Sequence, residues 1–391
     1  MDSTLLHIIV LGLVAAGVTL ALAPATKWLS KRLGAIDYPS KRRINTYPVP
    51  RLGGLALFGG LLVALMFEAA GEHLFDWEGF FGVGSLASIH YYGVITGIAF
   101  VTAVGTVDDI KSLHPGLKFT GQIVGACIIA FSGVLLSGIG DPFSSDFIEF
   151  GPWAYPLTVL YLVAFANIIN LIDGLDGLAA GVVSIAAFGL FIIAFSKGRM
   201  EAVMLSVILV GICLAFLRYN RYPASLYMGD SGALMLGTLL GIISLIGAMR
   251  SPTVIALIIP IVFAGIPVLD TLFTIIRRIR HGKPIHRFDL EHFHHILLRN
   301  GFHQRQAASI VCLWTGLLTG GGILISNVHG IMVYVLFVIL VLISAFLMWR
   351  FGLFDSVLRH HYVPRERPSG SRPESPDSQE LDDYVSGDKD R

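Results

Sequence analysis

The chain has 391 residues, of which 54% are hydrophobic and only 14% are charged, whereas about a quarter of the residues of an ordinary soluble domain carry a charge. Apolar stretches of about 20 residues, the length that crosses a bilayer, recur along the chain, which argues against two soluble domains and for one helical membrane bundle. The formal net charge of +1 excludes a broad basic face for nucleic acid, so any anion must be bound by local clusters.

About eleven membrane helices are predicted, which assigns the chain to the all-α class as a polytopic transmembrane bundle. The first apolar stretch lacks a preceding basic segment and is followed by Lys27, Lys31 and Arg32, so we expect a retained helix and not a signal peptide. The sixth and seventh predicted helices are joined only by a short Ser-Lys-Gly-Arg link. A total of ten helices, with these two counted as one, therefore stays open. The predicted ranges are 5–24, 52–70, 89–107, 119–139, 152–171, 178–196, 202–217, 232–249, 253–275, 307–326 and 331–349.

The distribution of basic residues predicts the orientation, because short loops rich in Lys and Arg stay in the cytoplasm. With Met1 outside, only three of the 28 basic residues fall in outside loops, namely Lys197, Arg199 and Arg250. We therefore expect the N-terminus outside and the C-terminus in the cytoplasm.

The predicted membrane domain covers residues 1–350, with the catalytic loops on its cytoplasmic side. Residues 351–391 form a cytoplasmic tail that is rich in Pro, Ser and charged residues and is expected to be disordered from about residue 364. The three cysteines, Cys127, Cys213 and Cys312, lie far apart in apolar runs and indicate neither a disulfide framework nor a metal motif.

The first polar cluster is at the end of the third helix, where Asp108 and Asp109 are followed by Lys111 and Lys118. Adjacent carboxylates repel each other and are costly inside hydrocarbon. The pair is either a solvated helix end or a group that holds a metal or takes a proton beside lysines that bind phosphate.

The second cluster lies between two apolar runs that leave little room for a loop. Asn167, Asn170 and Asp173 recur every three residues and would share one face of a helix, and Asp176 follows them. Asp-Gly-Leu-Asp-Gly alone fits a tight turn, but few short turns need two amides and two carboxylates.

The third cluster, Met228-Gly-Asp-Ser-Gly232, leads into the eighth helix. Asp230 or Ser231 could merely cap that helix. Beside a metal, however, aspartate is a hard oxygen ligand suited to Mg²⁺, which usually takes one or two carboxylates plus substrate phosphates.

The fourth cluster is the long inside loop 277–306, which contains Arg287, His292, His294 and His295 among other basic residues. It could anchor the chain or bind anionic lipid headgroups. A zinc site is disfavoured because no cysteine is near and arginine suits phosphate better. Together the four clusters predict an inside-facing site for a polyphosphate.

In this order, from about Asp37 to Gly301, the clusters resemble the polyprenyl-phosphate N-acetylhexosamine-1-phosphate transferases. The matching segments also include Pro50-Arg51-Leu-Gly-Gly54 and His292-Phe-His-His295. The His-x-His-His arrangement and Arg51 resemble the branch that loads N-acetylglucosamine-1-phosphate onto undecaprenyl phosphate. The branch that transfers phospho-N-acetylmuramoyl-pentapeptide, which is the alternative, carries three consecutive histidines.

The resemblance implies that the lipid phosphate attacks the β-phosphorus of a UDP-sugar, which gives UMP and a lipid diphosphate sugar for a cell-envelope polysaccharide. Direct attack is favoured over a two-step route through an aspartyl phosphate. The resemblance implies that Asn170 and Asp230 bind Mg²⁺, that Lys118 binds the diphosphate and that Asp176 recognises the uracil. Further substrate contacts are implied for Arg51, Asn167, Asp173 and Arg287. The implied catalytic residues are Asp108, Asp109, Asp230, His292, His294 and His295.

The implied cofactor is Mg²⁺, with Mn²⁺ as a substitute. The implied partners are a UDP-N-acetylhexosamine, undecaprenyl phosphate and membrane lipid, with a homodimer left open, and the implied location is the bacterial cytoplasmic membrane. A transporter is the main rival, but transporters tend to place polar groups near the midplane of the bilayer. A lipid-binding anchor would leave the acidic residues unexplained.

Overall fold

The computed structural model of the chain describes residues 3–39, 45, 47–74, 77, 89–140, 147–248, 293–328 and 330–351. Helices account for nearly all regular structure in these ranges. They are α1 (Ser3–Leu33), α2 (Gly53–Leu74), α3 (Tyr91–Lys111), α4 (Pro115–Phe131), α5 (Ala154–Ile172), α6 (Leu178–Ser196), α7 (Met200–Asn220), α8 (Gly229–Ala248), α11 (Phe293–Arg299), α12 (Gln304–Ser326) and α13 (Ile331–Arg350), with a 3₁₀ turn at Gly151–Trp153.

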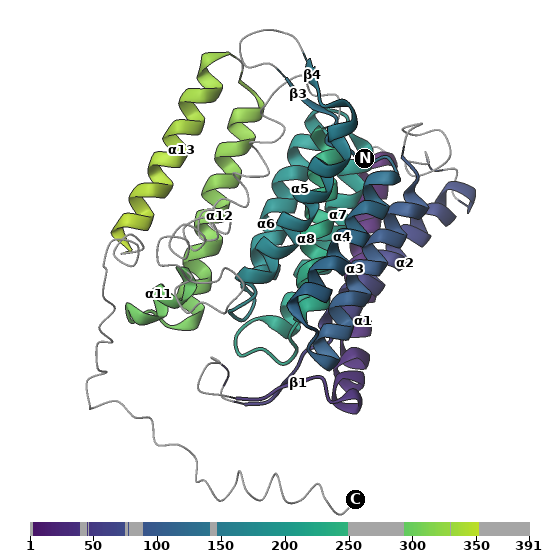
Figure 1. Cartoon of the computed structure of the whole chain (residues 1–391), viewed down its shortest axis with the longest axis vertical. Coiled ribbons are helices and arrows are strands. Elements are labelled where there is room, and N and C mark those ends of the chain that lie inside the picture. Colours follow the sequence, from purple (N-terminus) through teal and green to yellow (C-terminus); the bar gives the residue numbers. More distant parts are fainter. Residues whose placement is uncertain are drawn as a thin grey trace, which may run out of the picture.

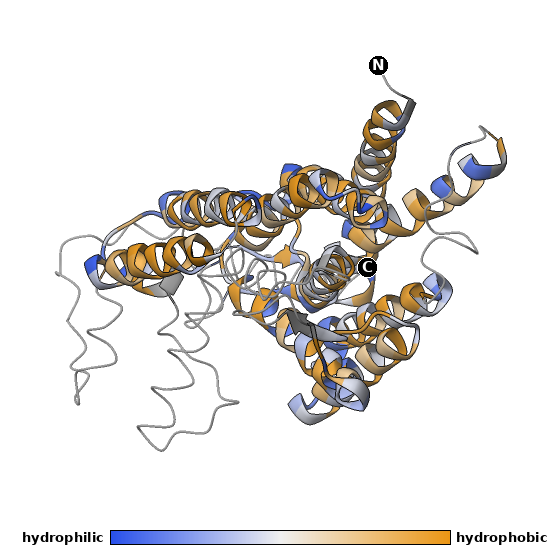
Figure 2. Ribbon diagram, turned by 90° about the horizontal axis from the view of Figure 1, so that it is seen from above, coloured by the Kyte–Doolittle hydropathy of each residue, from blue (hydrophilic) through white to orange (hydrophobic). Residues whose placement is uncertain are grey.

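Nine of the helices in the described part of the chain are long and apolar enough to cross a membrane, which confirms the predicted polytopic helical bundle. They are α1, α2, α3, α5, α6, α7, α8, α12 and α13. The remaining long helix, α4, has 17 apolar-rich residues and spans about 26 Å, the short end of what a bilayer core requires. Figure 2 shows hydrophobic residues on the outward as well as the inward sides of the helices, as a lipid environment allows.

Helix α8 lies in the middle of the bundle, and α13 lies at its side (Figure 1). Within the apolar stretch that could cross the membrane, 89% of the residues of α8 are buried inside the protein, compared with 22% for α13. It packs against α2, α3, α5, α6 and α7. Because α8 is held on most sides, its first residues have a fixed position relative to the ends of α2, α3 and α5.

Two short antiparallel hairpins lie at opposite ends of the bundle (Figure 1). Between α1 and α2, strand β1 (Ile36–Asp37) pairs with β2 (Val49–Pro50). Between α4 and α5, strand β3 (Gly138–Gly140) pairs with β4 (Phe147–Glu149). The end that carries β1 also carries α11, and it is the end at which polar residues of the sequence clusters meet.

The fourth helix differs from its predicted range, 119–139. It begins at Pro115, a residue that is favoured in the first turn because its missing N–H would have no partner there. It ends at Phe131, and Gly133 follows in the left-handed region with φ of 96°. Residues 134–139 are not helical, and in part form β3, so their prediction as helix was wrong.

The first helix is longer than predicted and continues from residue 24 to Leu33. Its last turn contains Lys31 and Arg32, and positive charge is favoured at the carbonyl end of a helix. The basic residues that mark the end of the apolar stretch thus belong to the same helix.

Helices α6 and α7 are two separate helices joined by a turn at residues 197–199. The lower count of ten, which would treat this pair as one helix, is therefore excluded for these residues. The predicted helix 253–275 lies outside the described residues. So does the predicted tail, apart from Phe351.

Candidate active site

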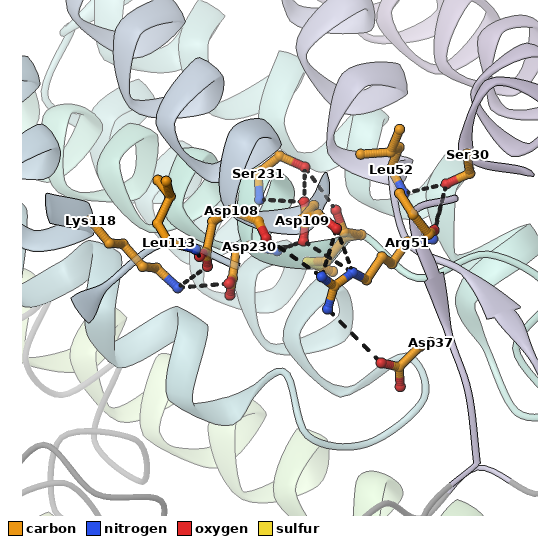
Figure 3. Close-up of polar contacts among 12 residues, drawn as sticks. Ser30, Asp37, Arg51, Leu52, Asp108, Asp109, Leu113, Lys118, Asp230 and Ser231 are labelled. Atoms are coloured by element: carbon orange, nitrogen blue, oxygen red, sulfur yellow. Dashed lines mark hydrogen bonds and ion pairs between the residues drawn. The ribbon is translucent and has the colours of Figure 1, made fainter. Parts of the chain in front are cut away.

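Carboxylates of the first and third sequence clusters meet where α3 ends and α8 begins (Figure 3). Asp108 and Asp109 lie in the last turn of α3, and Asp230 is the second residue of α8. Adjacent residues on an α-helix point about 100° apart, so the two carboxylates of α3 face different partners.

Asp109 points at the first turn of α8. Its Oδ1 accepts the N–H of Asp230 at 2.9 Å, and its Oδ2 accepts the N–H and the hydroxyl of Ser231 at 3.0 and 2.7 Å. The first N–H groups of a helix lack acceptors within that helix, and negative charge is favoured beside them. Asp109, which is only 2% exposed, therefore caps α8 from the end of another helix.

Asp108 points toward Lys118 near the start of α4. The Nζ of Lys118 lies 3.0 Å from Oδ2 of Asp108 and 2.7 Å from Oδ2 of Asp230, so the ammonium group bridges the two carboxylates. The Oδ1 of Asp108 accepts the N–H of Leu113 at 2.6 Å. The side chain of Asp230 is 29% exposed against 11% for Asp108, so Asp230 offers the more accessible carboxylate.

Arg51 follows β2 and reaches the end of α3 (Figure 3). Its Nε and Nη2 donate to the main-chain carbonyl of Asp109 at 2.9 and 2.6 Å, and its Nη1 lies 4.0 Å from Oδ1 of Asp37. The last carbonyls of a helix lack partners, and positive charge is favoured there. Arg51 is therefore engaged mainly with backbone, and its contact with substrate stays a prediction.

Glycines allow these segments to approach one another. A Cβ at Gly105 of α3 would lie 2.5 Å from the Cα of Ser231, and a Cβ at Gly229 would overlap the carbonyl of Arg51 and the carboxylate of Asp109. Gly229 also has φ of 67°, which L side chains rarely adopt. The junction therefore requires glycine at both positions.

The second sequence cluster closes α5. Asn167 lies within the bundle, where its Nδ2 donates to Oε1 of Gln122 on α4 and, at 2.8 Å, to the carbonyl of Val163. Asn170 lies almost one turn nearer the end of the helix, and Asp173 follows the last helical residue. Asn167 thus joins α5 to α4, whereas Asn170 and Asp173 lie at the helix end.

Asp173 is half-buried and close enough to the junction to experience its charge. The loss of solvation, helped by the negative charges of Asp230, Asp109 and Asp176, holds the pKa of Asp173 well above its usual value. An anionic Asp173 is therefore unfavourable unless a cation is near.

Asp176 lies beside the loop between α7 and α8. Its Oδ2 accepts the N–H of Ala224 at 2.9 Å, and Tyr227 and Gln304 also form hydrogen bonds with its carboxyl group. Burial raises the pKa of Asp176, although these hydrogen bonds oppose the rise. The hydroxyl of Tyr47 donates to the carbonyl of Ala224 at 3.0 Å, which brings a second aromatic ring to the same place.

Four residues around the site have no role predicted from the sequence, namely Gln122, Tyr47, Tyr227 and Asn220. Asn220 is buried and links the Asp176 turn to the following loop, because its Oδ1 accepts the N–H of Gly177 at 3.1 Å. Of these, only Gln122 had a clear signal: it is a polar residue in an apolar helix, one turn beyond Lys118.

Two of the predicted histidines lie on α11, at the β1 end of the bundle (Figure 1). They are His294 and His295, of which only the backbone is described. Arg287 and His292 lie outside the described residues. The roles of all four at substrate phosphates stay predictions.

The donor groups at the junction suit a divalent cation. The described residues contain no group of three or more His, Cys, Asp and Glu side chains that could hold a metal unaided. However, Asp108 and Asp230 share the ammonium of Lys118, and the carboxyl groups of Asp109 and Asp173 lie near Asp230. The site thus has more carboxyl groups than basic groups. Such a set of oxygen ligands fits Mg²⁺, which completes its coordination shell with phosphate oxygens and water.

The fold and the site together define a multi-pass membrane protein with an aspartate and lysine site, suited to phosphate and a divalent cation, at one end of its helices. Residues 91–248 match glycosyl transferase family 4. Together with the similarity to the relatives described next, this match shows that the chain belongs to that family.

Three relatives show how far the similarity extends. The chain is 34% identical to the "Probable undecaprenyl-phosphate N-acetylglucosaminyl 1-phosphate transferase" of Bacillus subtilis (strain 168), over 80% of this chain and 83% of the relative. It is 32% identical to the "Decaprenyl-phosphate N-acetylglucosaminephosphotransferase" of Mycobacterium tuberculosis (strain ATCC 25618 / H37Rv), over 79% and 80%. It is 27% identical to the "Undecaprenyl-phosphate alpha-N-acetylglucosaminyl 1-phosphate transferase" of Escherichia coli (strain K12), over 80% and 83%. The resemblance and the branch predicted from the motifs are confirmed.

Proposed function

We propose that the protein transfers N-acetylglucosamine-1-phosphate from UDP-N-acetylglucosamine to undecaprenyl phosphate, giving UMP and a lipid diphosphate sugar. The observation that carries this proposal is the position of Lys118 between Asp108 and Asp230, at the ends of membrane helices. The names of the three relatives, each matched over about four fifths of this chain, support the same reaction. The product would begin a cell-envelope polysaccharide.

In the proposed reaction an oxygen of the lipid phosphate attacks the β-phosphorus of the donor, and the bond from that phosphorus to the bridging oxygen breaks. UMP leaves with the bridging oxygen. A phosphate monoester is largely ionised at pH 7, so the residues mainly need to bring anionic groups together and stabilise the leaving phosphate. Lys118 supplies positive charge there, and Asp108 orients Lys118.

Asp230 and Asn170 are the proposed ligands of Mg²⁺, for which Mn²⁺ would substitute. When bound, the ion would neutralise phosphate charge as the bond to the leaving group breaks. Asp230 suits this role because its carboxylate is the most exposed at the junction.

The donor nucleoside is proposed to bind near Asp176, where Tyr47 and Tyr227 provide aromatic rings. The carboxyl group of Asp176 would read the uracil by hydrogen bonding. His294 and His295, on α11, are proposed to face the phosphates together with Arg287 and His292, which precede that helix in the sequence.

Direct attack by the lipid phosphate is favoured over an aspartyl-phosphate route. A carboxylate nucleophile needs a free oxygen in line with the β-phosphorus. Both oxygens of Asp109 accept hydrogen bonds from α8, and both oxygens of Asp108 have partners in Leu113 and Lys118. These contacts argue against either residue as a nucleophile.

The rival functions have less support. A transporter would place its polar site near the midplane of the bilayer, whereas Asp108 and Asp230 lie at helix ends. No relative described above is named as a phospho-N-acetylmuramoyl-pentapeptide transferase. We place the protein in the bacterial cytoplasmic membrane with the site on the cytoplasmic face, as the basic loops predict.

The test is to incubate the purified full chain with Mg²⁺, undecaprenyl phosphate and, separately, UDP-N-acetylglucosamine, UDP-N-acetylgalactosamine and UDP-N-acetylmuramoyl-pentapeptide. We expect release of UMP with UDP-N-acetylglucosamine, and only when the lipid phosphate is present. Release with the pentapeptide donor alone would identify the other branch, and no UMP with any donor would refute the proposal.

A further inference from the structure

The adjacent residues Asp108 and Asp109 have different environments. Asp108 contacts the side chain of Lys118, whereas Asp109 is 2% exposed and directs its carboxylate to the backbone and hydroxyl of α8. We propose that Asp109 and Arg51 are positioning residues that hold Asp230 in place and do not touch the substrate. The inference rests on the proposed function only in treating Asp230 as a group of the active site.

Asp109 directs both of its carboxylate oxygens at α8. Three donors from two consecutive residues, Asp230 and Ser231, lie 2.7 to 3.0 Å from these oxygens, and the side chain is buried. Gly229 lies so close that a Cβ there would overlap the carboxylate. A substrate phosphate therefore cannot reach Asp109 without displacing the start of α8.

Asp230 is held in two ways. Its main-chain N–H is bound by Asp109, and its side chain is bound by Lys118, which in turn contacts Asp108. Moving the first turn of α8 would therefore move the Asp230 carboxylate away from Lys118. Partners that orient a metal ligand commonly change metal affinity or activity by about 10- to 100-fold when they are removed.

Arg51 holds the end of α3 in the same way that Asp109 holds the start of α8. Its guanidinium group donates to the carbonyl of Asp109, and its main-chain N–H donates to the buried hydroxyl of Ser30 on α1 at 3.1 Å. The carbonyl end of α3, which carries partial negative charge, thus contacts Arg51, and the N–H end of α8, which carries partial positive charge, contacts Asp109. A continuous series of contacts runs from α1 through Arg51 and Asp109 to Asp230.

The test compares Asp109→Asn and Ser231→Ala, singly and together, in the full-length protein. Ser231→Ala leaves the Asp109 carboxylate intact but removes one of its donors. Ser206→Ala is the matched control, because Ser206 is equally buried on α7 and its hydroxyl has no hydrogen-bond partner among the described residues. The readouts are the affinity for Mn²⁺ alone, measured by electron paramagnetic resonance, the melting temperature, and kcat and KM.

We expect Asp109→Asn and Ser231→Ala each to weaken Mn²⁺ binding and lower kcat by about 10- to 100-fold, to lower the melting temperature, and to be less than additive when combined. KM for the sugar nucleotide should change little. The proposal is overturned if Asp109→Asn abolishes turnover while Mn²⁺ affinity and melting temperature match the wild type and Ser231→Ala behaves like Ser206→Ala. The non-additive loss of melting temperature needs neither substrate nor ion, so it tests this inference even if the proposed reaction fails.

Discussion

The Nζ of Lys118 lies 2.7 Å from Oδ2 of Asp230, which joins the start of α4 to the start of α8. The same ammonium group contacts Asp108, so it holds together two carboxylates that would otherwise repel each other. Lys118 is half-buried at the junction and has the charge that an incoming phosphate requires.

Replacing Lys118 with Met should lower kcat by about 100-fold or more, because a single preorganised group that stabilises developing charge is worth that much. Lys118→Arg should keep part of the activity. Lys111→Met is the matched control, since Lys111 is exposed at the end of α3. Steady-state kinetics of UMP release measure the effect, and equal rates for the two Met variants would contradict this role.

The hydrogen bond between Asn167 and Gln122 should act through the position of α4 relative to α5. Gln122 is buried and lies one turn beyond Lys118, so the pair helps to hold the helix that carries Lys118 against α5. Asn167→Leu should destabilise the protein by about 1–3 kcal/mol, because it leaves Oε1 of the buried Gln122 without its donor. Gln122→Leu should cost less, because Asn167 is half-buried and keeps its hydrogen bond to Val163. The double variant should be no worse than their sum.

Kinetics separate this structural role from the predicted role of Asn167 in substrate binding. If Asn167 binds substrate, Asn167→Leu raises KM and Gln122→Leu does not. If the pair is structural, both variants change KM to a similar extent.

The pKa of Asp173 predicts a pH-dependent cost in stability. A carboxyl group whose pKa is raised on folding stabilises the protein while it is protonated in both states. That contribution is lost as the pH rises from the unfolded-state pKa, about 4, through the raised folded-state pKa. Asp173→Asn should therefore raise the melting temperature more at pH 8 than at pH 5 when measured in EDTA. Glu149→Gln, an exposed carboxylate on β4, gives the baseline, and an equal effect of Asp173→Asn at both pH values would refute the prediction.

His7 and Glu68 form a buried ion pair between α1 and α2, and the ring of His7 stacks on Trp77 at 3.9 Å. Ser30, which contacts Arg51, lies 23 positions beyond His7 on the same helix, so the pair is about 35 Å from the active site. His7→Leu or Glu68→Leu should cost about 1–3 kcal/mol, because each removes a buried hydrogen bond between the two side chains.

The double variant should recover part of the stability that either single variant loses. At a temperature where each variant is folded, kcat should match that of the wild type. Melting curves and UMP release test both statements, and a tenfold loss of kcat in a fully folded variant would mean that the pair acts on the site.

The sequence predicts the membrane bundle well because a bilayer imposes long apolar runs, and α6 and α13 end within one residue of their predicted limits. It fails at residues 134–139, which are as apolar as a helix but follow a left-handed Gly133 and pair in part with β4. Apolar composition alone does not distinguish a membrane helix from a buried strand.

The sequence also predicted which carboxylates belong to the candidate site, but it did not predict that Asp108 and Asp109 have different roles. The two residues are chemically identical neighbours, and their difference arises because α8 begins beside one of them and α4 beside the other. Asn167 is a similar case, since its partner Gln122 is 45 positions away in the chain. Such roles depend on helix packing and require the structure.

The most direct test of the proposed reaction uses UDP-N-acetylglucosamine labelled with ³²P at the β-phosphate, together with undecaprenyl phosphate and Mg²⁺. Transfer of the sugar with its phosphate should move the label into the lipid fraction and release unlabelled UMP, and Asp230→Ala should insert normally but give no labelled lipid. Label recovered in released UDP, or an Asp230→Ala variant with wild-type turnover, would contradict the account.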